Sequence, residues 1–354
     1  MTDDAVTTHD AFHPGRVWLD TNGERIHAHG GSIFDEAGVY YWYGENKEFT
    51  RPGNGIRTWG VRCYRSTDLY NWEDLGLIIP PDEDDPTSPL HPARQLDRPH
   101  IAFNAATGTY VCWIKVMGGD VQLSTVLVAD SFLGPYRIVH RDFRPLGMNA
   151  GDFDLVVHPT DGKGYYVFER VHSELVWADL TDDYTDVTGY YTTHFPLRQP
   201  PFVREAPAYF SRGGRHYLVT SGTTSYFPNP SEVAVADTYH GPWTTLGDVH
   251  PDDASRTSFR TQVSSVFRHP AKRDLYIALG DRWVPGLAAD ASNFEREFER
   301  MFDPDDPERD LVLPTVDTSV ADYAWLPIRF DTGVPRIDWR DEWRLDEFED
   351  VHPS

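Results

Sequence analysis

One strand pattern recurs five times along this chain of 354 residues, and it constrains the fold more than any other feature. Each copy is a β-branched or aromatic run, and the copies are VYYWYG (39–44), TYVCWIKV (109–116), GYYVFER (164–170), HYLVTSG (216–222) and LYIALGDRW (275–283). Each run follows a turn-like cluster that offers the Asp, Asn or Gly of tight hairpin turns, and a short apolar strand precedes that cluster. A third strand, a turn and a fourth strand follow each run. The repeating unit is therefore four antiparallel strands.

A unit of four antiparallel strands is one blade of a β-propeller. The sequence predicts an all-β, five-bladed β-propeller, built as a single domain over 1–354. The blades are expected at roughly 25–80, 97–140, 149–190, 203–247 and 261–340. The stretch 292–302 is the one candidate for a short helix. The acidic, Pro-rich segments 82–89 and 303–310 are interpreted as surface loops, because no second domain is evident.

The composition restricts the kinds of partner that the chain can have. The formal net charge of −24 disfavours nucleic acid and anionic membrane surfaces, and 48 aromatic residues (11 Trp, 18 Tyr, 19 Phe) suit strands and flat sugar rings. No apolar run is long enough to span a membrane, and the first residues, MTDDAVTTHD, lack the pattern of a secretory signal. A cytoplasmic location is therefore expected. Cys63 and Cys112 are interpreted as buried apolar residues rather than a disulfide.

Polar residues recur where the first strand of each blade begins. They are His29, Asp97, Asp152, Glu205 and Gln262, and the last four are separated by 55, 53 and 57 residues. First strands line the central channel of a propeller, so we expect these side chains to meet at one site. The alternative interpretation is a polar channel with a structural role only.

Three carboxylates and an amide at one site favour acetal hydrolysis. Cleavage of a glycosidic bond needs a carboxylic acid that protonates the leaving oxygen and a base that activates water. Neighbouring negative charge and partial burial raise the pKa of such an acid into the useful range. Glu205, which precedes an apolar strand and has Asp152 one blade away, is the candidate acid. The alternative for this residue is a surface ion pair with Arg204.

At these residues the chain resembles glycoside hydrolase family 43 and, more narrowly, its exo-β-1,3-galactanase group. The resemblance covers nearly the whole chain. It rests on AHGGSIF with YYWYGENKE, DRPHIAFN with TGTYVCW, GDFDLV with DGKGYY, REAPAYF with YLVTSGTTSYFPN, TQVSSVF with GDRW, and YAWLPI. It implies an inverting, end-acting enzyme that releases galactose from β-1,3-galactan or galacto-oligosaccharides.

The resemblance also implies roles for individual residues. Glu205 matches the general acid, and Asp152 matches the carboxylate that orients the acid and tunes its pKa. The family's usual base is an Asp in the first blade, but this chain has Gly30 and Gly31 there; the galactanase group shares that gap and assigns water activation to a Gln that matches Gln262. The substrate-binding residues implied by the resemblance or expected at the same site are Glu45, Asp97, Thr224, Tyr226 and His29. Asp97 stands where the group has Glu, and Ser225 and Tyr226 stand where it has Gly and Trp.

No metal ligand set and no required cofactor are predicted. Axial histidines in this family can lie near Ca²⁺ or water, but calcium prefers oxygen ligands and the chain has no EF-hand-like run, so the sequence supports no structural calcium. A carbohydrate is the expected partner. Two other functions stay open at this point: the β-xylosidase or α-L-arabinofuranosidase activity of the wider family, and a non-catalytic carbohydrate-binding propeller.

Overall fold

The computed structural model describes residues 8–118, 121–287, 291–307, 309, 315–331 and 333–351. It confirms the all-β class and the five-bladed propeller: the strands form five four-stranded antiparallel sheets, each continuous in the sequence. We number these sheets blades 1 to 5. Terminal residues 1–7 and 352–354 lie outside the described residues, as do Glu308 and Asp310 of the acidic segment 303–310.

Each blade contains four strands that are consecutive in the sequence. Blade 1 comprises β1 (His29–Glu36), β2 (Val39–Glu45), β3 (Val61–Ser66) and β4 (Glu73–Ile79). Blade 2 comprises β5 (Leu96–Asn104), β6 (Thr109–Gly118), β7 (Val121–Ala129) and β8 (Arg137–Phe143). Blade 3 comprises β9 (Ala150–Val157), β10 (Gly164–Arg170), β11 (Glu174–Leu180) and β12 (Val187–His194). Blade 4 comprises β13 (Arg204–Arg212), β14 (Arg215–Gly222), β15 (Ser231–Ala236) and β16 (Thr244–Asp248). Blade 5 comprises β17 (Gln262–Arg268), β18 (Tyr276–Arg282), β19 (Asp322–Arg329) and β20 (Arg336–Ile337).

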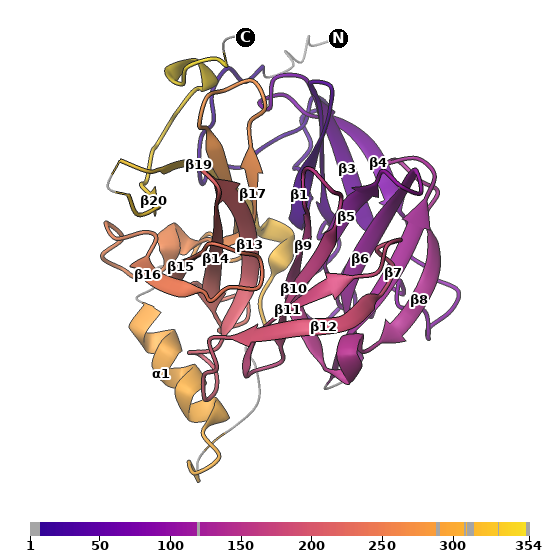
Figure 1. The fold of residues 1–354 in the computed structure, drawn as a ribbon, viewed down its shortest axis with the longest axis vertical. Coiled ribbons are helices and arrows are strands. Elements are labelled where there is room, and N and C mark those ends of the chain that lie inside the picture. The colour runs from indigo at the N-terminus through magenta and orange to yellow at the C-terminus, as the bar shows by residue number, and fades with distance from the viewer. Residues whose placement is uncertain are drawn as a thin grey trace.

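The first strands of the blades form a closed ring. β1 contacts β5, β5 contacts β9, β9 contacts β13, β13 contacts β17, and β17 returns to β1. In Figure 1 these five strands lie toward the middle of the molecule, and the fourth strands β4, β8, β12, β16 and β20 lie at its outside. All five first strands therefore begin around one axis, as the repeat predicted.

Aromatic and aliphatic side chains fill each seam between neighbouring blades. Among the described residues, the buried apolar side chains divide into five clusters, each spanning one pair of adjacent blades. Cys63 and Cys112 are buried free thiols in the cluster between blades 1 and 2, which confirms their prediction as apolar core residues. Burial of aromatic surface on both faces of every sheet stabilises the ring as a whole.

The joint between blades 1 and 5 carries an additional clasp formed by the two end segments of the described chain. Phe12 pairs with Trp343 in an antiparallel bridge, and their rings stack at 4.1 Å between centroids. Trp343 is fully buried and donates its indole N–H to the carbonyl of Trp325 at 2.8 Å. Both end segments thus pack across the one joint that no chain connection crosses directly.

The predicted helix is present as α1 (Ala291–Phe302), inserted between β18 and β19. The ring of Phe294 stacks on Phe227 of blade 4 at 4.6 Å, and the backbone carbonyl of Glu299 accepts a hydrogen bond from Gln199 at 3.2 Å. Figure 1 shows α1 at the opposite end of the molecule from both termini. The insertion thus reaches from blade 5 across to blade 4 and to the segment that precedes it.

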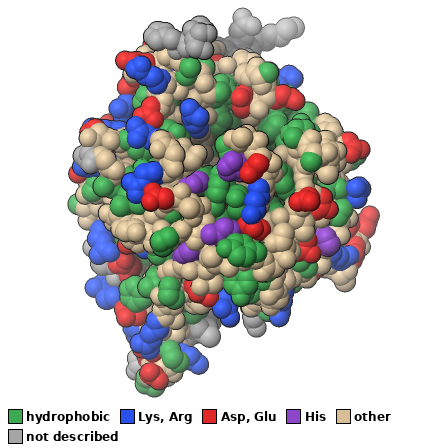
Figure 2. All heavy atoms as spheres, viewed as in Figure 1, with side chains coloured by type: hydrophobic (Ala, Val, Ile, Leu, Met, Phe, Trp, Pro, Cys, Tyr) green, Lys and Arg blue, Asp and Glu red, His purple; other side chains and the backbone are tan. Residues whose placement is uncertain are grey.

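The surface is acidic without a single-sign patch on the face that Figure 2 shows, where red and blue side chains alternate. In the part of the chain that the structure describes, no helix is long and apolar enough to cross a membrane.

Candidate active site

At the start of the first strand of every blade, the pairing register with the second strand is irregular. This irregularity turns the polar side chain at the start of the strand toward the axis. The register shifts between His29 and Ser32, between Asp97 and His100, near Ala150–Phe153, between Glu205 and Ala208, and between Val263 and Ser265. Such bulges bend the strand and redirect the side chain at its end. They bring Asp97, Asp152, Glu205 and Gln262 into one connected polar cluster, as predicted from the phase of the repeat.

Asp152 lies between two cations. Its Oδ1 is 2.7 Å from Lys115 Nζ, and its Oδ2 is 2.8 Å from Arg98 Nε. Lys115 Nζ also lies 3.0 Å from Asp97 Oδ2. Burial alone would raise the pKa of Asp152, but the charges of Arg98 and Lys115 outweigh it and hold that pKa well below its usual range. Asp152 is therefore a fixed negative charge at neutral pH.

Glu205 has the opposite electrostatic environment. Burial, followed by the negative charges of Asp152 and Glu169, raises the pKa of Glu205 well above its usual range. Its neighbour Arg204 pairs with Glu232 and lies over the ring of Phe195, so the alternative of an Arg204–Glu205 pair is not what the structure shows. Two carboxyl groups with pKa values pushed apart are the arrangement expected of an acid and its charge-tuning partner.

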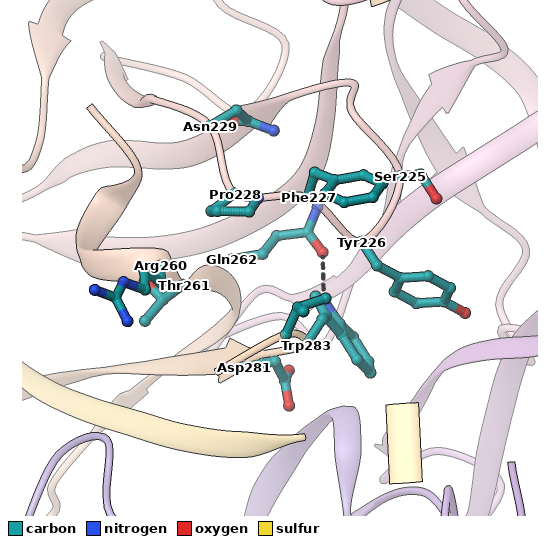
Figure 3. Close-up of a pocket in the computed structure, with 11 residues that line it drawn as sticks. Ser225, Tyr226, Phe227, Pro228, Asn229, Arg260, Thr261, Gln262, Asp281 and Trp283 are labelled. Carbon is teal, nitrogen blue, oxygen red and sulfur yellow. Dashed lines mark hydrogen bonds between the residues drawn. The ribbon is translucent and has the colours of Figure 1, made fainter. Parts of the chain in front are cut away.

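The amide of Gln262 connects these groups. Its Oε1 accepts hydrogen bonds from Arg98 Nη2 at 2.6 Å and from Trp283 Nε1 at 3.2 Å (Figure 3). Its Nε2 donates to Glu205 Oε1 at 3.1 Å and to Ser221 Oγ at 3.0 Å. Arg and Trp can only donate, which fixes the orientation of the amide. All four hydrogen-bonding positions are engaged, so a water reaches this amide only by replacing a partner.

The first blade has no room for a base at Gly30 and Gly31. A Cβ on Gly30, whose φ is +63°, would lie 2.3 Å from Glu45 Oε1, and one on Gly31 would lie 1.9 Å from the carbonyl oxygen of Tyr43. Any side chain there must displace a buried carboxylate or the neighbouring strand. The absence of an Asp at this position is therefore built into the packing of β1 against β2.

We expect Gly31→Ala to lower the free energy of unfolding by about 2 kcal/mol or more, since overpacking of a tight site costs about 1–3 kcal/mol. Thermal unfolding of the variant measures this loss. Gly286→Ala is the matched control, because a Cβ on Gly286 meets no atom within 4 Å. Equal melting temperatures for the two variants would contradict the account of the missing base.

Glu45 and Lys47 close the blade 1 side of the site. Lys47 Nζ lies 2.7 Å from Glu45 Oε2 and 3.8 Å from Asp97 Oδ1, and Glu45 Oε1 accepts the backbone N–H of Arg98 at 2.8 Å. Burial raises the pKa of Glu45 to about 7, although Lys47 opposes the shift. Glu45 and Asp97, the two carboxylates expected to bind sugar hydroxyls, thus both lie beside Lys47 Nζ.

Two aromatic rings form a wall beside the Gln262 amide. Tyr226 and Trp283 meet edge to face at 5.1 Å (Figure 3). Lys47 Nζ lies 6.0 Å from the centre of the Trp283 ring. Gln95 donates to the hydroxyl of Tyr226 at 3.3 Å and to Asp97 Oδ2 at 2.9 Å. The wall is therefore tied to the carboxylate cluster. An aromatic face next to carboxylates is typical of sites that bind sugar rings.

Thr224 and His29 take supporting places instead of the substrate contact expected for them. Thr224 is fully buried, and its hydroxyl donates to the carbonyl of Phe227 and accepts from Asn229 at 2.7 Å. His29 is also fully buried, with Nδ1 3.0 Å from Asp281 and Nε2 3.2 Å from the hydroxyl of Tyr323. Neither side chain offers a free polar atom, because local packing uses each one completely.

Sequence reasoning missed a second ring of polar residues, at the ends of the second strands. It consists of Glu45, Lys115, Glu169, Ser221 and Asp281, of which only Glu45 was predicted. Each lies opposite the start of its blade's first strand, so the same repeat phase could have identified all five. Arg98 and Trp283 had no such signal. In the described part of the chain, no group of three or more His, Cys, Asp or Glu side chains is placed to hold a metal ion.

Comparison with known proteins agrees with this geometry. The family model for glycosyl hydrolases family 43 matches residues 30–297. A solved GH43 β-1,3-galactosidase, BT0265, is 30% identical, with 96% of this chain and 65% of that chain covered and a TM-score of 0.77. The exo-β-1,3-galactanase 1,3Gal43A of Clostridium thermocellum is 25% identical, with 94% of this chain and 66% of that chain covered and a TM-score of 0.74.

One relative with a similar sequence is named for a different activity. The putative beta-xylosidase of Escherichia coli (strain K12) is 24% identical in an alignment of 309 positions that covers 80% of this chain and 50% of the relative. The chain thus spans about half the length of this relative and 65% of BT0265.

Proposed function

This chain belongs to glycosyl hydrolases family 43, and from that premise we propose that it is an exo-acting, inverting glycoside hydrolase that releases galactose from β-1,3-linked galactan or galacto-oligosaccharides. Membership of the family makes it a glycoside hydrolase that acts on carbohydrate. The sugar and the linkage are the proposal. They are supported by the solved β-1,3-galactosidase and the solved exo-β-1,3-galactanase, each of which matches this chain over 94% or more of its length.

The observation that carries the mechanism is the opposed pair Glu205 and Asp152. Glu205, kept protonated by burial and by nearby negative charge, would donate its proton to the glycosidic oxygen of the leaving sugar. Asp152, kept ionised by Arg98 and Lys115, would sustain that high pKa throughout the reaction. A non-catalytic binding propeller would have no need of this charge separation.

We assign to Gln262 the positioning of the water that attacks the anomeric carbon. An inverting enzyme places its acid and its water-positioning group on opposite faces of the sugar. The hydrogen bond between Gln262 Nε2 and Glu205 Oε1, at 3.1 Å, spans the two groups, so a substrate entering between them would break it. The freed amide could then orient a water toward the anomeric carbon. Glu45 and Asp97 would bind the hydroxyls of the terminal sugar, with Tyr226 and Trp283 as its aromatic wall.

The experiment that tests this proposal is incubation with β-1,3-galactobiose, followed by proton NMR during the first minutes. We expect galactose to appear first as the α-anomer, because a single displacement inverts the β-linkage. Initial β-anomer would contradict inversion, and the absence of any release would contradict the substrate.

The second candidate is β-xylosidase activity, which the sequence relative from Escherichia coli favours. Xylobiose in the same assay separates the two candidates. Release of xylose without release of galactose would replace the proposed substrate and leave the proposed roles of Glu205 and Asp152 standing.

A further inference from the structure

Beside Glu205, the seam between blades 3 and 4 carries a pair of residues that the proposed mechanism does not use. Glu169 is 1% exposed, and its Oε1 accepts hydrogen bonds from the backbone N–H of His172 at 2.8 Å and from His172 Nδ1 at 3.1 Å. His172 has a φ of +56°, a left-handed conformation that costs a non-glycine residue roughly 1 kcal/mol or more. The carboxylate thus holds a histidine in one strained orientation.

This pair adjoins the catalytic carboxylates. A Cβ on Gly151, the residue before Asp152, would lie only 2.1 Å from Glu169 Oε2. Of the five residues in the second-strand ring, Glu45, Lys115, Ser221 and Asp281 bond directly to side chains of the cluster already described or to His29. Glu169 instead bonds to His172 in the turn between β10 and β11. It therefore connects the polar cluster to this turn.

The free nitrogen of His172 is the chemically active end of the pair. A carboxylate can only accept, so Nδ1 carries the proton and Nε2 of the neutral ring is an acceptor. The side chain is 32% exposed, and its ring lies 5.3 Å from Phe302 of α1. An oriented acceptor that solvent can reach, bonded to a carboxylate whose charge acts on Glu205, suits the hydroxyl group of a sugar.

Apolar side chains are exposed on the same seam. Phe202 is 49% exposed and Leu197 is 39% exposed. The N–H of Leu197 donates to the carbonyl of Ser173 at 2.8 Å, and the carbonyl of Pro201 accepts from Thr223 at 2.9 Å, which fixes this segment between His172 and the Thr224 loop. The exposed ring of Phe202 thus lies on a segment that is hydrogen-bonded to the turn of His172, and an aromatic ring together with an oriented polar group can bind the apolar face and the hydroxyls of one sugar.

We propose that the seam between blades 3 and 4 is the subsite for the leaving-group sugar, with His172, positioned by Glu169, receiving its hydroxyls and Phe202 contacting its apolar face. The inference rests on the proposed function, since it takes Glu205 as the acid at the scissile bond. The terminal sugar is bound on the opposite side, among Glu45, Asp97 and Trp283. The remainder of the saccharide therefore leaves the pit over His172.

The test compares a disaccharide with a monosaccharide in the Glu205→Gln background, which prevents turnover. Titration calorimetry gives the Kd of β-1,3-galactobiose and of galactose, and the ratio of the two Kd values measures the contribution of the second sugar. We expect His172→Ala and Phe202→Ala each to reduce the disaccharide advantage by about 10-fold, with the Kd of galactose changed by less than about 2-fold.

Matched controls are present in the same blade. His158 has the same 32% exposure and also bonds a carboxylate, but it lies at the turn between β9 and β10, at the far end of the blade. Tyr190 on β12 is 58% exposed. His158→Ala and Tyr190→Ala should leave both Kd values unchanged.

The outcomes separate the two proposals. If the ratio of the two Kd values is unchanged in both His172→Ala and Phe202→Ala, the proposed subsite is overturned. It is also overturned if these variants lose galactose binding and galactobiose binding equally. If the parent binds neither galactose nor galactobiose, the galactosidase proposal fails, and xylobiose against xylose then decides the subsite by the same ratio.

Discussion

Glu205→Gln should lower the rate of sugar release by about 10²–10⁴-fold, because one acid-base residue typically contributes that much. The substitution keeps the shape and the hydrogen-bonding reach of the side chain but removes the proton that the leaving oxygen needs. Substrate binding should survive, so the loss should appear in kcat rather than in KM. Initial rates on β-1,3-galactobiose, with released galactose measured enzymatically, give both constants.

Glu36→Gln is the matched control, since Glu36 is an exposed carboxylate at the other end of a first strand. Its kcat should equal that of the unmodified enzyme. A Glu205→Gln variant with near-normal kcat would remove Glu205 from the role of acid.

The same variant has a second signature in stability. The pKa of Glu205 in the folded protein is raised above its unfolded value, chiefly by burial. The favourable contribution of the protonated group is therefore complete below about pH 4 and is lost as the pH rises through the folded pKa. Glu205→Gln has no such loss, so its melting temperature should exceed that of the unmodified enzyme at pH 8 and match it near pH 4.

Lys115→Met should have the largest effect on stability. Lys115 Nζ is shared by Asp97 at 3.0 Å and Asp152 at 2.7 Å, and all three side chains are buried. Removal of one partner from a buried ion pair costs about 3–5 kcal/mol, because the remaining charges lose their compensation. We therefore expect the free energy of unfolding at pH 7 to fall by about that amount, measured by urea unfolding.

The pH dependence gives the sign of this effect. The pKa values of Asp97 and Asp152 are lowered in the folded protein, because Lys115 acts together with Lys47 on Asp97 and together with Arg98 on Asp152 and outweighs the effect of burial. The stability contributed by such groups is present above the unfolded pKa near 4 and is lost as the pH falls through the folded pKa. The difference between Lys115→Met and the unmodified enzyme should therefore shrink below about pH 4.

Lys163→Met is the matched control for this prediction. Lys163 forms a pair of similar length with Asp179, at 2.6 Å, but its side chain is 46% exposed. Exposed ion pairs contribute about 0–1 kcal/mol. A Lys115→Met variant no less stable than Lys163→Met would show that the buried triad is not a source of stability.

Much of the fold was predictable because the repeat depends on short-range residue preferences. Each hairpin turn is set by short-range residue preferences, as at Ala37 and Gly38, which both have positive φ values. The starts of the first strands could be located to within two residues because one polar side chain interrupts an apolar pattern in every blade. That phase was enough to bring Asp97, Asp152, Glu205 and Gln262 together.

The remaining site residues depend on geometry that no local pattern carries. Arg98 has a φ of +50°, and this left-handed turn within the β5 bulge lets its guanidinium reach Asp152 and Gln262 in other blades. The positions of Thr224 and His29 were predicted correctly only as neighbours of the site. Whether a side chain faces the substrate or holds the scaffold is decided by partners such as Asp281 and Tyr323, which lie more than 250 residues away in sequence from His29.

The clasp between Phe12 and Trp343 has a consequence for how this molecule loses its activity. Every blade contributes at least one side chain to the polar cluster, so opening of the ring at any single joint separates groups that must act within a few ångströms of one another. The joint between blades 1 and 5 is the only one without a direct chain connection, and the stacked end segments secure it. Enzymatic turnover in this architecture therefore reports whether the ring of blades is closed. It is lost when one joint opens, even while the individual blades stay folded.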